Sequence, residues 1–247
     1  AGLDMLGQAP AMQEVFRAIG RLSQSNVTVL ITGESGTGKE LAARLVHRLG
    51  PRAEAPFVAI NCVAIASNLV ESELFGHEKG AFTGADRRRR GLVETASEGT
   101  LFLDEIGDMT QELQGRLLRV IEERRVRPVG SEREVVVKTR FIAATNRDLE
   151  KAVAAGRFRA DLFHRLNVLR VELPPLRART GDAALLARHF VAHFAGRSGR
   201  PRLELGAAVL DAMAAYPFPG NVRELRNMIE QAVLLTDSDR LDLDLFP

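Results

Sequence analysis

The chain has 247 residues, enough for one large domain or two modest ones. Charged residues make up 27% and hydrophobic residues 45%, which is ordinary for a soluble globular protein. The net charge of +2 is too balanced to indicate nucleic-acid binding by itself.

The single cysteine, Cys62, excludes an internal disulfide, and we expect it to be a small buried residue rather than a nucleophile. The sequence has no run of 18 apolar residues and no signal-peptide pattern. These features predict a cytoplasmic protein without a membrane span.

The first predicted strand, residues 27–31, runs directly into a glycine-rich turn that reads GESGTGKE. The spacing G-x-x-x-x-G-K is typical of a phosphate loop, in which backbone N–H groups, a helix N-terminus and a lysine meet an anion. Glu40 stands where Ser or Thr usually supplies a hydroxyl ligand for magnesium. A plain turn between strand and helix is the alternative. The predicted nucleotide-binding residues are Gly33, Glu34, Ser35, Gly36, Thr37, Gly38, Lys39 and Glu40.

The rest of the chain falls into two regions of different periodicity. Short apolar strands alternate with helical patterns up to Pro174, which predicts an α/β domain with a parallel sheet between helices. Only helical patterns follow, so we expect an α/β domain over 1–175 and a small all-α lid over 176–247. The predicted strands are 56–60, 100–103, 141–144 and 168–173, with helices at 67–75, 111–123, 182–197, 206–216 and 221–236 and a small β excursion at 125–137.

Two carboxylates, Asp104 and Glu105, directly follow the predicted strand 100–103. The carboxyl ends of parallel strands open into the ligand crevice of such sheets. Asp104 is therefore the candidate magnesium ligand, and Glu105 is the candidate group that orients the attacking water. An acidic strand end that merely begins a loop is the alternative.

Further polar groups follow the same logic. Thr145 and Asn146 end the strand at 141–144, where they could reach the γ-phosphate or the water, although a simple turn is equally compatible. Arg159 and Arg165, six residues apart, would lie on different faces of one helix. They could stabilise phosphoryl charge in their own chain or in a neighbouring subunit, or be ordinary solvated arginines.

The segment GAFTGA at 80–85 places Phe82 in a charged loop with glycines on both sides. An exposed aromatic side chain there would be a binding tip, whereas the alternative is a ring that tucks back into the core. The arginines at 87–90 are interpreted as a solvated run or as charge that supports this tip.

Together these motifs resemble the central AAA+ domain of the bacterial enhancer-binding proteins that activate sigma-54 RNA polymerase. The resemblance extends from residue 6 to about residue 245. It rests on the loop at 33–40 with its final Glu, on ESELFGHEK followed by the intact GAFTGA, on a Walker B-like segment at 99–108 and on the sensor II-like PGNVREL at 219–225.

The resemblance implies a role for each matching residue. Lys39 would bind the phosphates of ATP, Asp104 and Glu105 would serve Mg²⁺ and water, and Asn61 would restrain the catalytic glutamate until the target is engaged. The remaining roles are sensor I for Thr145 and Asn146, arginine fingers given to the adjacent subunit for Arg159 and Arg165, sensor II for Arg223, and sigma-54 contact for Gly80, Ala81, Phe82, Thr83, Gly84 and Ala85.

The expected function is an ATP-hydrolysing motor that assembles as a homo-oligomer, by resemblance a hexameric ring, and remodels the closed promoter complex of the sigma-54 RNA polymerase holoenzyme into the open one. An ATP-binding regulatory module that controls oligomerisation or DNA affinity is the alternative, and a chelatase or clamp-loader subunit would lack the GAFTGA tip. Since neither a receiver domain nor a helix-turn-helix domain is visible in the sequence, we expect an excised central domain, with contacts to promoter and enhancer DNA made by other parts of the protein.

Overall fold

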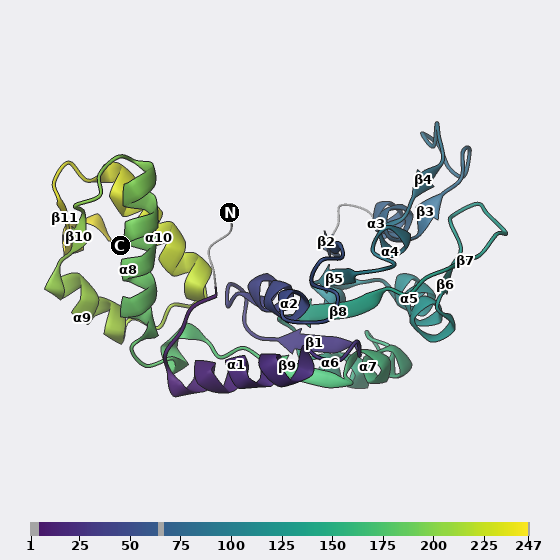
Figure 1. The fold of residues 1–247 in the computed structure, drawn as a ribbon, viewed down its shortest axis with the longest axis horizontal. Helices are drawn as coiled ribbons and strands as arrows, with labels where there is room; N and C mark the ends of the chain where they lie inside the picture. Colours follow the sequence, from purple (N-terminus) through teal and green to yellow (C-terminus); the bar gives the residue numbers. More distant parts are fainter. Residues whose placement is uncertain (1–4, 64–66, 247) are drawn as a thin grey trace. The chain divides into compact units, whose positions relative to one another are not determined.

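The computed structural model describes residues 5–63 and 67–246 (Figure 1). The helices are α1 (Pro10–Leu22), α2 (Lys39–Arg48), α3 (Ser67–Phe75), α4 (Leu92–Thr95), α5 (Gln111–Glu123), α6 (Leu149–Ala154), α7 (Ala160–Leu166), α8 (Asp182–Arg197), α9 (Ala207–Ala215) and α10 (Asn221–Leu235), with 3₁₀ turns η1 (Ile106–Asp108), η2 (Leu176–Ala178) and η3 (Leu243–Leu245). The strands are β1 (Val29–Thr32), β2 (Phe57–Asn61), β3 (Gly76–His77), β4 (Arg89–Arg90), β5 (Thr100–Asp104), β6 (Arg125–Val126), β7 (Val135–Val136), β8 (Arg140–Thr145), β9 (Leu169–Glu172), β10 (Glu204–Leu205) and β11 (Arg240–Leu241).

The chain divides into two compact units. The sheet unit comprises Ala18–Thr32 and Glu40–Glu172, and the lid unit comprises Ala1–Arg17, Gly33–Lys39 and Leu173–Pro247. The phosphate loop thus shares its compact unit with the segment after residue 173.

The sheet unit is built on five parallel strands in the order β2-β5-β8-β1-β9. Every residue of β1 and β8 is buried, as expected for central strands covered on both faces. The register pairs Asn61 with Asp104 and Thr32 with Thr145, so the strands end at one common edge. The parallel α/β sheet predicted from the sequence is confirmed.

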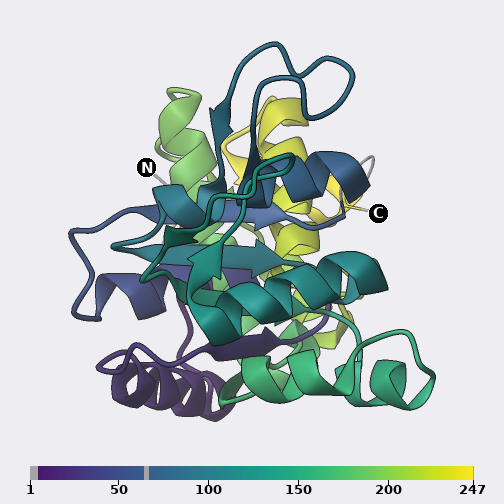
Figure 2. The ribbon, with the colours of Figure 1, turned by 90° about the vertical axis from the view of Figure 1, so that its right-hand side faces the viewer.

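Helix α5 packs against this sheet along the apolar face that its sequence predicts (Figure 2). The helix begins after Thr110, whose hydroxyl accepts a hydrogen bond from the N–H of Leu113 at 3.3 Å. Leu113, Leu117 and Ile121 are buried in the core that β5 and β8 also line. Each such side chain contributes about 1.5–3 kcal/mol of transfer free energy.

The lid unit has its own core, formed mainly by α8, α9 and α10. Phe190 and Phe194 of α8 are buried in this core together with Leu225 and Ile229 of α10. The predicted helical character after residue 175 is confirmed, except that β10 and β11 add a short parallel ladder that the sequence did not indicate.

Two arms extend from the sheet unit (Figures 1 and 2). Strands β3 and β4 form an antiparallel ribbon whose connection carries GAFTGA, and β6 and β7 form the hairpin predicted at 125–137. The arms are joined, because the N–H of Glu78 donates to the carbonyl of Val129 at 3.0 Å and the N–H of Val129 donates to the carbonyl of Gly76 at 2.8 Å. The position of one arm therefore constrains the other.

The lengths of the helices show whether any of them could span a membrane. Helix α8 spans 16 residues, fewer than the ~20 needed to cross a bilayer. No helix in the described parts of the chain combines the length and apolar character of a membrane span.

Candidate nucleotide-binding site

The phosphate loop connects β1 to α2 and is held in shape by close backbone approach. Gly36 has a positive φ of 83°, and a Cβ at this position would lie 2.2 Å from the carbonyl oxygen of Gly220. Any other residue would clash with that backbone, so glycine is required here.

Lys39, the first residue of α2, folds back over the loop. Its Nζ donates to the carbonyls of Gly33 at 3.0 Å and Glu34 at 2.9 Å, and the side chain is only 7% exposed. The hydroxyl of Thr37 donates to the same Glu34 carbonyl at 2.7 Å. The lysine charge and the N-terminus of α2 therefore both lie at the loop, which is the arrangement that binds an anionic phosphate.

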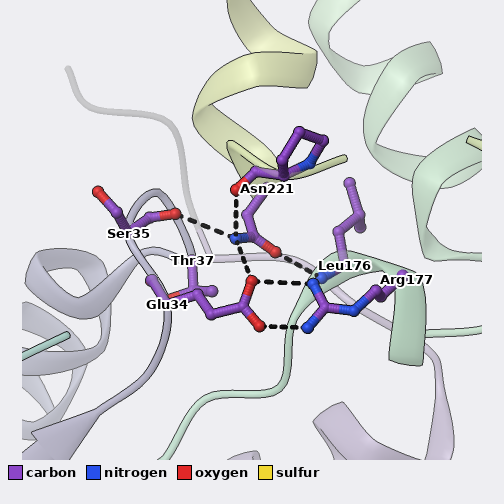
Figure 3. A network of polar contacts seen from close by, with 7 residues as sticks. Glu34, Ser35, Thr37, Leu176, Arg177 and Asn221 are labelled. Carbon is purple, nitrogen blue, oxygen red and sulfur yellow. Dashed lines mark hydrogen bonds and ion pairs between the residues drawn. The ribbon is translucent and has the colours of Figure 1, made fainter. Parts of the chain in front are cut away.

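The Glu34 side chain and the Ser35 carbonyl face residues of η2 and α10 (Figure 3). The Glu34 carboxylate forms a two-point ion pair with Arg177 and also accepts from Asn221 Nδ2 at 3.3 Å. The hydrogen bonds from Arg177 hold the pKa of Glu34 below its usual value. Arg223, the predicted sensor II residue, brings Nη1 to 3.5 Å from the Ser35 hydroxyl.

Glu40 differs from these residues because it is exposed and forms a helical ion pair with Arg44, at 3.6 Å. The sequence had also not indicated Arg177 or Asn221. Asn221 lies within the sensor II-like segment, directly after Gly220. Asn tolerates the left-handed backbone that this residue adopts, so the Gly-Asn pair could have indicated an unusual turn at this position.

In the sheet unit, Asp104 is the last residue of β5 and Glu105 follows it. Both carboxylate side chains are half-buried, and the N–H of Glu105 donates to Asp104 Oδ1 at 2.9 Å. Glu105 has a left-handed backbone with φ 54°, an unusual conformation for a residue with a side chain. Such strain concentrates at functional sites and marks Glu105 as a candidate catalytic group.

The other predicted residues of this edge lie at neighbouring strand ends. Asn61 ends β2 beside Asp104, and its Oδ1 accepts from the N–H of Val63 at 2.9 Å. Thr145 ends β8 and is fully buried, with its hydroxyl accepting from the N–H of Arg147 at 3.0 Å. Asn146 follows it and is exposed. The structure thus brings the ends of β2, β5 and β8 together as predicted from parallel topology.

The chemistry of these side chains fits magnesium. Mg²⁺ takes hard oxygen ligands, and in phosphoryl-transfer sites it uses one or two carboxylates together with phosphate oxygens and water. Asp104 offers a carboxylate of this kind at the strand edge. Across residues 5–63 and 67–246, no group of three or more His, Cys, Asp or Glu side chains forms a cage that could hold a metal without a substrate.

The two predicted finger arginines lie near α7. Arg159 precedes this helix as its N-cap residue, so the expectation that both arginines lie within one helix is wrong. Its guanidinium binds Asp161 through Nε at 3.1 Å and Nη2 at 2.9 Å, which raises the pKa of Arg159. Arg165 lies in the last turn and its Nε is 3.5 Å from Glu122. Both side chains are exposed and reachable from outside their own chain.

The loop at 80–85 projects beyond β3 and β4 (Figure 2). It is closed by a hydrogen bond from the N–H of Gly80 to the carbonyl of Ala85 at 2.9 Å. Phe82 is 37% exposed, with its ring edge-on to His77 at a centroid distance of 4.9 Å. Thr83 is exposed and Ala85 is buried. The aromatic ring therefore stays at the surface instead of entering the core of the sheet unit.

Cys62 lies next to the candidate catalytic carboxylates and is 5% exposed. Burial, followed by the charges of Asp104, Asp108 and Glu105, raises the pKa of its thiol to about 12. Since only the thiolate reacts with alkylating agents, we expect iodoacetamide at pH 8 to modify the folded chain at least about 100-fold more slowly than the chain in guanidinium chloride. Mass spectrometry of timed samples measures both rates, and equal rates would show that the thiol is accessible and ionised.

Comparison with known proteins identifies two families along the chain. The model of the sigma-54 interaction domain matches residues 5–172, and that of the AAA+ ATPase lid domain matches residues 177–247. The chain is 55% identical over 238 residues to the DNA-binding transcriptional regulator NtrC of Proteus hauseri, covering 96% of this chain and 50% of that protein. It is 50% identical over 237 residues to the response regulator protein PilR of Pseudomonas aeruginosa, covering 96% of this chain and 53% of that protein. The chain therefore spans about half the length of the curated relatives it matches.

Solved structures agree with this relationship. NtrX from Brucella abortus in complex with ADP superposes with a TM-score of 0.92 at 37% identity, over 98% of this chain and 54% of that one. Its complex with ATP gives a TM-score of 0.92 over 100% of this chain and 57% of that one. The five-stranded parallel sheet with a helical lid is accordingly the P-loop NTPase fold. The chain belongs to the sigma-54 interaction domain family, the AAA+ domain of NtrC-like transcriptional regulators.

Proposed function

We propose that the chain is the ATP-hydrolysing motor domain of a sigma-54-dependent transcriptional activator, which remodels the closed sigma-54 RNA polymerase promoter complex into the open one. The observation that carries this proposal is the combination, within the sheet unit, of two carboxylates at the strand edge and an exposed aromatic loop on a projecting arm. The first suits phosphoryl transfer, and the second suits contact with a protein partner.

In this proposal the chain's own groups have separate tasks. The N–H groups of the phosphate loop and Lys39 bind the β- and γ-phosphates of ATP, and Glu105 orients and polarises the attacking water. Asp104 would hold Mg²⁺, which when bound neutralises charge on the phosphates. Asn61 would restrain Glu105 until the partner is engaged, while Thr145, Asn146 and Arg223 would sense the γ-phosphate.

The exposed arginines support a site shared between copies of the chain. Arg159 and Arg165 are charged side chains at the surface, each with a carboxylate partner in its own chain that an incoming phosphate could replace. A positively charged arginine supplied by a neighbour is an effective way to stabilise phosphoryl charge. We therefore propose a homo-oligomeric ring, by family resemblance a hexamer, in which these two residues complete the neighbour's site.

The loop at 80–85 would transmit the state of the nucleotide to sigma-54. Its glycines have open space around them, since a Cβ at Gly80 or Gly84 would meet no atom within 4 Å. Gly80 and Gly84 both have a positive φ, of 80° and 96°, and Phe82 and Thr83 between them form the exposed tip of the loop. Contacts with promoter and enhancer DNA would be made mainly by other parts of the protein. We place the protein in the cytoplasm.

ATPase activity as a function of protein concentration tests the shared site. A motor that needs a neighbour's arginines should gain specific activity as the chain assembles, and Arg159→Ala should remain inactive at every concentration. The removal of such an arginine costs about 10³-fold or more in related phosphoryl-transfer enzymes. Phosphate release measured from dilute to concentrated protein gives the specific activity, and sedimentation velocity on the same samples gives the degree of assembly. Nearly no hydrolysis at any concentration would favour a regulatory module that binds ATP without using it as fuel.

A further inference from the structure

The side chain of Glu34 belongs to a closed polar network that the proposed catalytic scheme does not use (Figure 3). Arg177 of η2 pairs with the Glu34 carboxylate, and Asn221 Nδ2 donates to Glu34 Oε1 at 3.3 Å. The Oδ1 of Asn221 accepts from the N–H of Leu176 at 2.8 Å, next to Arg177 in the chain. The network therefore joins the phosphate loop, η2 and the start of α10, all within the lid unit.

The network also reaches the backbone of the loop. Asn221 Nδ2 donates to the carbonyl of Ser35 at 3.0 Å, and the N–H of Arg223 donates to the carbonyl of Gly36 at 3.2 Å. In a planar trans peptide the C=O and the next N–H point in opposite directions. Because both carbonyls face the first turn of α10, the N–H groups of Gly36 and Thr37 point away from it.

Asn221 is itself rigidly placed. It is fully buried and adopts a left-handed backbone with φ 54°, which Asn tolerates better than most residues. Its amide carries three hydrogen bonds to loop and turn atoms within 3.3 Å, which fixes which end of the amide donates and which accepts. The side chain can therefore act as a fixed reference for the direction of the loop peptides.

We propose that Glu34, Arg177 and Asn221 are positioning residues that hold the N–H groups of Gly36 and Thr37 in the direction needed to bind a nucleotide β-phosphate. This inference rests on the proposed binding of nucleotide at the phosphate loop. Glu34 acts through the loop and not by touching the nucleotide. Its negative charge is neutralised by Arg177, so it does not repel the phosphate.

Calorimetric titration of the chain with ADP and with AMP tests this assignment, since only ADP carries the β-phosphate. Glu34→Gln and Arg177→Gln should each weaken ADP binding about two- to fivefold, as expected for an exposed ion pair. The double variant should be no weaker than either single variant. Asn221→Asp, which replaces the donating end of the amide by a carboxylate oxygen, should weaken ADP at least about tenfold. AMP affinity should change less than twofold in all of them.

The exposed ion pair Arg170–Glu150 of the sheet unit, at 3.1 Å, supplies the matched control. Arg170→Gln and Glu150→Gln should leave ADP affinity unchanged. If the network variants bind ADP like the unsubstituted chain while Lys39→Ala loses it, the positioning role is wrong and the proposed function stands. If the unsubstituted chain does not bind ADP, the proposed function itself fails. Equal weakening of ADP and AMP overturns the assignment, because it indicates a general structural role. Should Asn221→Asp unfold, the surface-exposed pair Glu34 and Arg177 decides the outcome.

Discussion

Replacement of Lys39 with alanine is expected to abolish measurable ATP binding and to lower ATP hydrolysis at least about 100-fold. The Nζ of Lys39 lies within 3.0 Å of two loop carbonyls, and the side chain is almost entirely buried, so no mobile surface lysine can replace it. Loss of a preorganised donor in a water-excluded site typically lowers the rate about 10²–10³-fold. Calorimetry for binding and phosphate release for turnover measure the two effects.

Lys151→Ala provides a control for this experiment, because Lys151 is an exposed lysine of α6 in the sheet unit. Its activity should equal that of the unsubstituted chain. A thermal melt must show that Lys39→Ala is folded, since the Lys39 side chain also hydrogen-bonds to two carbonyls of the loop. Normal ATP turnover by a folded Lys39→Ala variant would contradict the assignment of the phosphate loop.

The second large effect is expected at the tip of the projecting loop. Thr83→Ala should keep ATPase activity within about twofold, because Thr83 is exposed on an arm separate from the strand edge that carries Asp104 and Glu105. Promoter opening by sigma-54 RNA polymerase should fall at least about tenfold, since interface energy concentrates in a few central side chains. Open complexes are counted by permanganate footprinting, and binding is measured as capture of sigma-54 with a transition-state analogue of ATP.

Thr180→Ala is the matched substitution, because Thr180 is an exposed threonine just before α8. It should leave both ATPase activity and promoter opening unchanged. A Thr83→Ala variant that opens promoters at the normal rate would remove the loop from the proposed mechanism, while the nucleotide site would be unaffected by that result.

Local patterns predicted most of the fold because their causes are local. Helix α5 was expected at 111–123 and occupies Gln111–Glu123, since its apolar spacing lies within the segment and its capping residue, Thr110, directly precedes it. The candidate catalytic edge was also predictable, because parallel strands that end in Asp104 and Thr145 must end on the same side of the sheet.

The polar contacts around the phosphate loop could not be predicted, because they join residues far apart in the sequence. Glu34 and Arg177 are separated by 143 positions, and Asn221 and Ser35 by 186, so no window of sequence contains both ends of either contact. The left-handed backbone of Glu105 was hidden for a different reason, since glutamate gives no hint of a conformation that its surroundings impose.

Because the Cys62 thiol is buried and has a raised pKa, thiol reagents should label the unsubstituted chain very little. A cysteine introduced at the exposed tip, as in Thr83→Cys, would be the one thiol available to a maleimide fluorophore at neutral pH. Emission from that single reporter could then follow the loop through each stage of ATP turnover, with no need to remove the native sulfur that sits beside the carboxylates.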